Sequence, residues 1–191
     1  MSFWRWKAPV YSFARRLPLL RNILTAEQRH LIKLLQKFPP AFGVHLDLGS
    51  GTGGAWPVLP LTTKRIAVDA ELSMLARNPA ANRIVARAEA LPFAAKNFSF
   101  VSAVGLLEYI EDAEKFFSEA KRVLQPAGYF LFTSSPPNWA NRWRLVWGEK
   151  LHFYSKQQIH IILKANDWRI LGYARSWLQE QWLVSRGASP V

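Results

Sequence analysis

The chain has 191 residues, half of them hydrophobic, and carries 25 Lys and Arg against 13 Asp and Glu, a formal net charge of +12 at pH 7. This length suits one domain with a substantial core, so we expect a single domain over residues 1–191. The sequence contains no cysteine. Disulfides, thiolate metal sites and cysteine nucleophiles are therefore excluded, and no metal site is predicted.

The positive charge is unevenly distributed. Residues 1–40 hold eight Lys and Arg against one acid, and residues 139–191 hold eight against three, whereas nine bases meet nine acids in residues 41–138. Positive flanks attract phosphates or anionic lipid headgroups, and a merely solvated surface is the alternative. We expect residues 1–40 to form a basic N-terminal helical cap and residues 139–154 to form a substrate lid.

Periodicity predicts an alternation of helices and strands. A helix is expected over residues 20–38, where leucines recur at helical spacing until two prolines end it. Strands are expected at 43–48, 65–69, 83–87, 98–104, 128–134, 168–175 and 180–185, and further helices at 54–61, 71–77, 111–124 and 155–166. The predicted fold class is α/β: a Rossmann-like, doubly wound, mostly parallel seven-stranded sheet with helices on both faces. Such sheets bind ligands at the carboxyl ends of their strands.

A glycine-rich turn follows the first predicted strand. Asp47 precedes the run Gly49, Ser50, Gly51, Thr52 and Gly53. Alternating glycines permit positive φ angles and let a ligand approach the backbone more closely than any side chain would allow. We therefore expect a small cofactor at this turn.

Asp69 ends the second predicted strand, twenty positions after Gly49. At this spacing a carboxylate receives the two hydroxyls of a nucleoside ribose. The sequence therefore predicts an adenosine-containing cofactor. The alternative role of Asp69 is to cap the helix that follows.

Two cofactors fit the glycine pattern. Gly49, Gly51 and Gly54 satisfy the G-x-G-x-x-G pattern of dinucleotide sites. Asp47 favours the other cofactor, because a carboxylate beside the turn would repel a pyrophosphate and attract a cationic amino-acid group. The order D-x-G-x-G-x-G is used by S-adenosylmethionine enzymes, so S-adenosylmethionine is the predicted cofactor. A structural role of Asp47 is the alternative.

Further segments follow these motifs in a characteristic order. They are Ala88–Phe93, Phe98–Val101, Leu107–Asp112, Arg122–Gly128 and Leu151–Ser155, the last followed by residues 159–168. With them, residues 43 to about 170 resemble the small class I S-adenosylmethionine-dependent methyltransferases, the methyltransferase type 11 group that includes quinone and small-molecule methylases. The resemblance implies methyl transfer by in-line displacement, with S-adenosylhomocysteine as the product.

The resemblance also implies a set of cofactor contacts. The backbone around Ala88 and Glu89 would meet the adenine, and Val104 and Gly105 would face the methionine part. Arg87 stands where the family often has an aspartate that accepts the adenine amino hydrogen, and arginine cannot accept one. The full predicted set is Asp47, Gly49, Ser50, Gly51, Gly53, Asp69, Ala70, Ala88, Glu89, Val104 and Gly105.

Candidate catalytic residues are His152 and Tyr154, which lie where a loop would reach the substrate. A histidine that merely belongs to the surface or the core is the alternative. Methyl transfer from a sulfonium depends chiefly on orienting two reactants, so the sequence needs no obvious catalytic constellation to encode an enzyme.

The acceptor is inferred from the flanks. Trp139, Trp143 and Trp147 recur at helical spacing, with Arg142 and Arg144 between them. Such a mix suits a lid over a small hydrophobic or aromatic acceptor, including a lipid-linked one, or a face that rests on an anionic membrane. Packing of these tryptophans against the core is the alternative.

Two other functions stay open. The basic flanks support a methyltransferase of RNA or another polyanion, although nucleic acid is the less favoured partner. Arg87 and a helix shortened by Pro57 and Pro60 support a noncatalytic binding protein of the same fold. No apolar stretch of about 20 residues predicts a transmembrane helix, so the expected location is the cytoplasm, with peripheral membrane contact as a further expectation.

Overall fold

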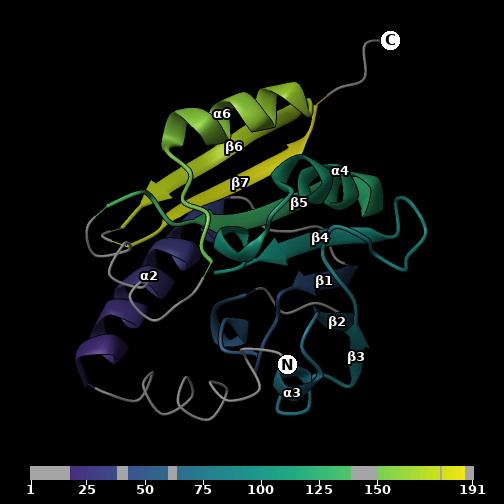
Figure 1. The fold of residues 1–191 in the computed structure, drawn as a ribbon, viewed down its shortest axis with the longest axis horizontal. Coiled ribbons are helices and arrows are strands. Elements are labelled where there is room, and N and C mark those ends of the chain that lie inside the picture. The colour runs from purple at the N-terminus through teal and green to yellow at the C-terminus, as the bar shows by residue number, and fades with distance from the viewer. Residues whose placement is uncertain (1–17, 38–42, 60–63, 139–149, 177, 188–191) are drawn as a thin grey trace.

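The computed structural model describes residues 18–37, 43–59, 64–138, 150–176 and 178–187 (Figure 1). The strands are β1 (Val44–Leu48), β2 (Lys64–Asp69), β3 (Asn82–Val85), β4 (Phe98–Ala103), β5 (Leu124–Ser134), β6 (Trp168–Arg175) and β7 (Glu180–Arg186). The helices are α2 (Pro18–Lys37), α3 (Leu72–Leu75), α4 (Ala113–Val123) and α6 (Lys156–Ala165), with two 3₁₀ turns, η1 (Trp56–Val58) and η2 (Leu107–Tyr109). All seven strands lie where the sequence predicts them.

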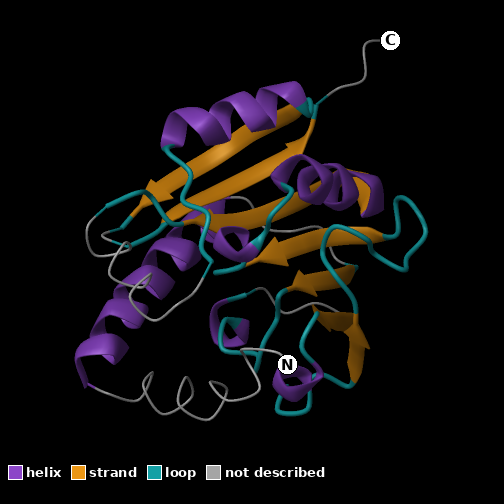
Figure 2. Cartoon of the chain, viewed as in Figure 1, coloured by secondary structure: helices purple, strands orange, loops and turns teal. Residues whose placement is uncertain are grey.

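The strands form one seven-stranded sheet in the order β3-β2-β1-β4-β5-β7-β6. Strands β1 to β5 pair in parallel, whereas β7 runs antiparallel to both β5 and β6. Figure 2 shows this sheet with α4 and α6 on one face and α2 on the other. The predicted Rossmann-like α/β fold is confirmed.

Each face of the sheet has its own apolar core. The larger core joins the sheet to α4 and α6, and Phe116 and Phe117 of α4 meet Phe130 and Phe132 of β5 in edge-to-face contacts. The smaller core packs the leucines of α2 against the opposite face. These two cores hold the carboxyl ends of β1, β2 and β4 at one edge of the sheet.

The prediction of a helix over residues 54–61 is wrong. Only the three-residue turn η1 forms there, and Leu59 already has extended backbone angles. Pro57 is tolerated in the first turn of a helix but brings no amide hydrogen. Residues 60 and 61 lie outside the described part of the chain. Helix α3 is likewise shorter than the predicted 71–77.

Helix α6 begins with a capping box. The Ser155 hydroxyl accepts from the backbone nitrogen of Gln158, and the Gln158 side chain accepts from the backbone nitrogen of Ser155 at 2.8 Å. We expect Ser155→Ala to lower the free energy of unfolding by about 1 kcal/mol, since two backbone donors lose their fixed partners. Urea unfolding followed by circular dichroism measures the loss. The exposed Gln157→Ala in the same helix is the control, and equal midpoints for the two variants would contradict the assignment.

Among the described residues, no helix is both long enough and apolar enough to pass through a membrane.

Candidate functional site

The loop after β1 adopts the conformation that its glycines permit. Gly49, Gly51 and Gly53 all have positive φ angles, of 61°, 51° and 81°. A Cβ at Gly49 would lie 2.6 Å from Leu106 Cδ1, in the loop after β4. The backbone nitrogen of Ser50 donates to the Val68 carbonyl of β2 at 3.0 Å. The glycine loop is therefore packed against the ends of both neighbouring strands.

Asp69 joins the end of β2 to this loop. Its Oδ2 accepts from the backbone nitrogen of Gly51 at 2.8 Å, and its Oδ1 accepts from the backbone nitrogen of Glu71 at 2.9 Å. Burial raises the pKa of this carboxyl above its usual value. Glu71 is the N-cap residue of α3, so Asp69 does not cap that helix. The structure thus brings together the two motifs from which the cofactor was predicted, and the ribose contact itself stays a prediction.

Asp47 lies beneath the loop rather than on its surface. Only 2% of the residue is exposed. Its Oδ2 accepts from the indole nitrogen of Trp56 at 2.9 Å, and its Oδ1 accepts from the Ser102 hydroxyl at 2.5 Å. Each carboxylate oxygen therefore has a donor from the protein, which gives Asp47 a structural role. Its predicted contact with the cofactor stays a prediction.

These contacts belong to a closed chain of side chains that we call the polar ring: Arg65, His45, Ser102, Asp47 and Trp56. Arg65 Nε donates to His45 Nδ1 at 3.0 Å, and His45 Nε2 lies 2.8 Å from the Ser102 hydroxyl. The Arg65 guanidinium lies 4.4 Å from the centre of the Trp56 ring, which completes the ring through a cation–π contact.

The ring fixes the protonation state of its histidine. Burial, together with the charge of Arg65, lowers the pKa of His45 to about 3. Because Nδ1 of the neutral imidazole accepts from Arg65, Nε2 carries the hydrogen and donates to Ser102. Ser102 in turn donates to Asp47. All hydrogen bonds of the ring therefore converge on the Asp47 carboxylate.

A double-mutant cycle tests the bond between Trp56 and Asp47. We expect a coupling of about 1.5 kcal/mol between Trp56→Phe and Asp47→Asn in the free energy of unfolding, because phenylalanine removes the donor to a charged acceptor. The cycle cancels the effect of replacing an indole by the smaller phenyl ring. The Trp56→Phe variant alone cannot separate that effect from the loss of the hydrogen bond. Because the asparagine oxygen can still accept from the indole, additive effects in urea unfolding would show that the charge of Asp47 adds nothing to this bond.

The segment after β3 carries the predicted adenine contacts. Ala88 and Glu89 are both buried. Glu89 Oε1 accepts from Arg87 Nη2 at 2.9 Å, while the Arg87 side chain itself is 68% exposed. The arginine that replaces the family's usual aspartate thus forms an ion pair with the neighbouring acid. The roles of Ala88 and Glu89 in adenine binding stay predictions.

Val104 and Gly105 lie beyond the end of β4. Gly105 has a φ of 69°, and its backbone nitrogen donates to the Thr133 hydroxyl at 2.7 Å. A Cβ built on Gly105 would meet one atom of the described residues within 4 Å, Gln179 Nε2 at 3.9 Å. Apart from the two chain neighbours of Gly105, the described residues therefore leave room there, in contrast to Gly49.

The two candidate catalytic residues lie in the segment before α6. His152 is exposed, and its backbone nitrogen donates to the Glu108 carbonyl at 2.7 Å. Tyr154 packs against the larger core, where burial and the charge of Asp112 raise its pKa above the usual value. Their catalytic roles stay predictions. The tryptophans of the predicted lid lie outside the described residues, as do residues 1–17 and 38–40 of the predicted N-terminal cap.

Sequence reasoning missed four members of the polar ring, all except Asp47. The sequence offered one signal for this ring, since His45 and Ser102 are polar residues inside largely apolar strands. Which of these polar residues face one another depends on strand register, which the sequence pattern does not reveal.

Comparison with known proteins agrees with this geometry. Residues 46–132 match the family model described as a methyltransferase domain. The chain is 33% identical over 111 residues to an uncharacterised protein of Methanocaldococcus jannaschii, MJ1123, across 58% of this chain and 49% of that protein. It is 29% identical over 109 residues to malonyl-[acyl-carrier protein] O-methyltransferase of Methylovorus, across 49% of this chain and 37% of that enzyme. The chain thus spans half or less of the length of these relatives.

The fold has close counterparts among solved structures. Magnesium protoporphyrin IX methyltransferase from Synechocystis, crystallised with bound S-adenosylhomocysteine, superposes with a TM-score of 0.70 at 14% identity. The match covers 97% of this chain and 94% of that one. At this level of identity the likeness establishes the fold alone.

Proposed function

We propose that this chain, which belongs to the class I S-adenosylmethionine-dependent methyltransferases, binds S-adenosylmethionine beside the loops after β1, β2 and β4 and transfers its methyl group. The hydrogen bond from Gly51 to Asp69 carries the proposal. It joins the glycine turn to the acid at the end of β2, inside the segment that matches the methyltransferase domain.

The residues at this edge fit such a cofactor. Each Asp69 oxygen accepts one backbone hydrogen bond and keeps a lone pair for a ribose hydroxyl. The loop keeps the positive φ angles that its glycines permit, and at Gly105 the described residues leave room around the backbone. Bound S-adenosylmethionine supplies an electrophilic methyl group with a neutral leaving group. The protein's part is binding and orientation, which alone can supply roughly 7 to 11 kcal/mol.

The proposed acceptor is a small hydrophobic or aromatic molecule, including one attached to a lipid. The mixture of tryptophan and arginine in residues 139–147 supports it. Of two proteins similar to this chain, one is named for a malonyl group attached to an acyl-carrier protein and the other for magnesium protoporphyrin IX, which is a small aromatic molecule. With such an acceptor we propose a cytoplasmic protein that also contacts membranes peripherally.

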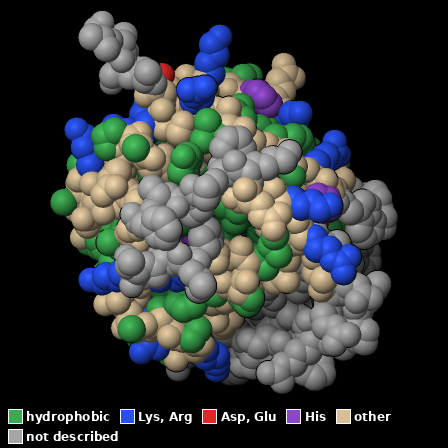
Figure 3. Space-filling model, turned by 180° about the vertical axis from the view of Figure 1, so that it is seen from behind, with side chains coloured by type: hydrophobic (Ala, Val, Ile, Leu, Met, Phe, Trp, Pro, Cys, Tyr) green, Lys and Arg blue, Asp and Glu red, His purple; other side chains and the backbone are tan. Residues whose placement is uncertain are grey.

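RNA or another polyanion is the second candidate acceptor. The formal charge of +12 favours it. On the face shown in Figure 3, Lys and Arg side chains are spread over the surface and acidic side chains are rare. The same charge also suits anionic lipid headgroups, and the segment that holds the cofactor site is neutral.

Calorimetry with four ligands tests the cofactor. We expect micromolar binding of S-adenosylmethionine and S-adenosylhomocysteine and none of the oxidised or reduced nicotinamide dinucleotides. Dinucleotide binding would overturn the assignment of S-adenosylmethionine as the cofactor. Absence of binding by all four ligands would favour a noncatalytic role. Transfer of a labelled methyl group to lipophilic phenols or quinols would then support the proposed acceptor class, whereas label in RNA would replace it.

A further inference from the structure

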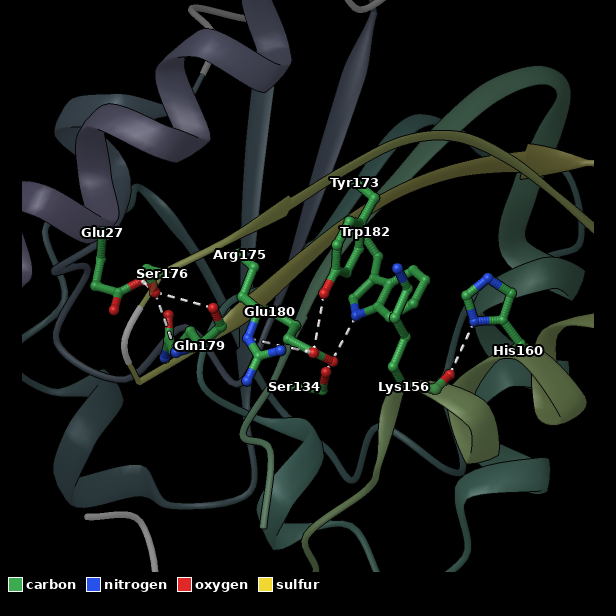
Figure 4. Close-up of polar contacts among 10 residues, drawn as sticks. All are labelled: Glu27, Ser134, Lys156, His160, Tyr173, Arg175, Ser176, Gln179, Glu180 and Trp182. Carbon is green, nitrogen blue, oxygen red and sulfur yellow. Dashed lines mark hydrogen bonds and ion pairs between the residues drawn. The ribbon is translucent and has the colours of Figure 1, made fainter. Parts of the chain in front are cut away.

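The turn between β6 and β7 is anchored to α2. The backbone nitrogen of Ser176 donates to the Gln179 carbonyl at 2.9 Å, and the backbone nitrogen of Gln179 donates to the Ser176 hydroxyl at 3.1 Å. The Ser176 hydroxyl also bonds to the Glu27 carboxyl, and Gln181 Nε2 donates to the Glu27 carbonyl at 3.0 Å. Figure 4 shows Glu27, Ser176 and Gln179 gathered at this turn. The backbone that carries Gln179 is therefore fixed.

Strand register brings this turn to the end of the sheet where β1, β2 and β4 have their carboxyl ends and the loops of the cofactor site follow. Ala103 of β4 pairs with Phe132 of β5, and Ser134 of β5 pairs with Glu180 of β7. Gly105, two residues beyond Ala103, thus lies at the level of Ser134 and Glu180. Gln179 precedes Glu180, so its side chain reaches past the end of β5 toward Gly105.

Gln179 borders the space above Gly105 that the described residues leave open. Among the described residues, its Nε2 is the atom within 4 Å of a Cβ built there, at 3.9 Å. The described residues supply no hydrogen-bond partner for its carboxamide, whereas the amide nitrogen of nearby Gln181 donates to Glu27. A carboxamide both donates and accepts hydrogen bonds. A polar group thus faces the open space with its bonding capacity unused by these residues.

We propose that the Gln179 carboxamide borders the transferred methyl group and is the polar contact through which this site selects its acceptor. The acceptor class that fits is a molecule whose nucleophile belongs to a hydrogen-bonding group such as a hydroxyl or an amine. This inference rests on the proposed function, because it takes Gly105 to face the methionine part of the cofactor.

Charge substitution tests the location of Gln179. S-adenosylmethionine carries a positive sulfonium where S-adenosylhomocysteine has a neutral sulfur, so the ratio of their dissociation constants reports charge placed near the methyl group. We expect Gln179→Lys to raise the ratio of the S-adenosylmethionine constant to the S-adenosylhomocysteine constant by about 5-fold, and Gln179→Glu to lower it by about as much. A unit charge roughly 8 Å away in a partly screened site has an effect of this order. The same substitutions at exposed Gln125, at the opposite end of β5, should leave the ratio unchanged.

The outcomes separate this inference from the proposed function. An unchanged ratio in both Gln179 variants, with both ligands still bound, would overturn the role of Gln179 and leave the methyltransferase assignment standing. Failure of the unsubstituted protein to bind either ligand would instead overturn the proposed function, and the inference would fall with it.

A second variant keeps the inference testable if the charged ones fail to fold. Because the chain has no cysteine, Gln179→Cys introduces a single thiol whose reaction with a disulfide reagent can be timed. We expect saturating S-adenosylmethionine to slow this reaction by about 10-fold or more and to leave Gln125→Cys unaffected. Equal rates with and without cofactor, in protein shown by calorimetry to be saturated, would overturn the inference.

Discussion

Asp69→Ala is expected to weaken binding of S-adenosylmethionine by roughly 10-fold to 150-fold, because each lost hydrogen bond to a charged group costs about 1.5 to 3 kcal/mol. Calorimetry on the purified variant measures the change. Glu114→Ala, an exposed acid in α4, is the matched control and should bind normally. Unchanged affinity in Asp69→Ala would exclude the predicted ribose contact.

The structure adds a complication to this experiment, since Asp69 also holds the backbone nitrogen of Gly51. Loss of affinity in Asp69→Ala could therefore come from a displaced loop. The analogue of S-adenosylhomocysteine that lacks the ribose 2′-hydroxyl separates the two causes. If Asp69 binds the ribose, the substitution should weaken the analogue less than the parent compound. Equal losses for both ligands would assign Asp69 to positioning the loop alone.

Features that are local in the chain follow most directly from the sequence. The glycine turn, Asp69 and all seven strands follow from short patterns of residue type, and the described structure places each strand as expected. The short helix predicted at 54–61 is reduced further, to the turn η1, with Pro57 in its first turn and Leu59 already extended. Local patterns therefore predict the strands better than the lengths of the two short helical segments, η1 and α3.

The polar ring depends on contacts that no local pattern contains. His45 pairs with Arg65 in the parallel register of β1 and β2, and Asp47 pairs with Ser102 in that of β1 and β4. A shift of one residue in either pairing would separate these side chains onto opposite faces. Asp47 is the one member of the polar ring among the predicted cofactor contacts, and the register shows why its carboxylate also accepts from Ser102 and Trp56, while the cofactor contact stays a prediction. The place of Gln179 beside Gly105 likewise depends on register between distant strands.

Acidification is expected to destabilise the protein through His45. The pKa of this imidazole is about 3 in the folded chain, against an ordinary value of 6.5. Between these values the unfolded chain binds a proton that the folded chain excludes, so the free energy of unfolding falls as pH falls. The His45 contribution from pH 6.5 to pH 4 is about 3 kcal/mol. Urea unfolding at a series of pH values measures it.

Other groups titrate in the same acid range, so the contribution of His45 must be isolated as a difference. Burial raises the folded pKa values of Glu27, Asp47 and Asp69, and these groups oppose the loss because the folded chain takes up their protons first. Glu119 has a lowered pKa and adds to the loss only at the acid end. We expect His45→Gln to flatten the decline by about 3 kcal/mol over this range, whatever its stability at neutral pH. Parallel curves for the two proteins would show that His45 is not held neutral by the ring. A steeper curve for the unsubstituted protein would show that the contacts of His45 with Arg65 and Ser102 depend on an uncharged imidazole. The hydrogen bond that Ser102 donates to Asp47, beneath the glycine loop, would then depend on it as well.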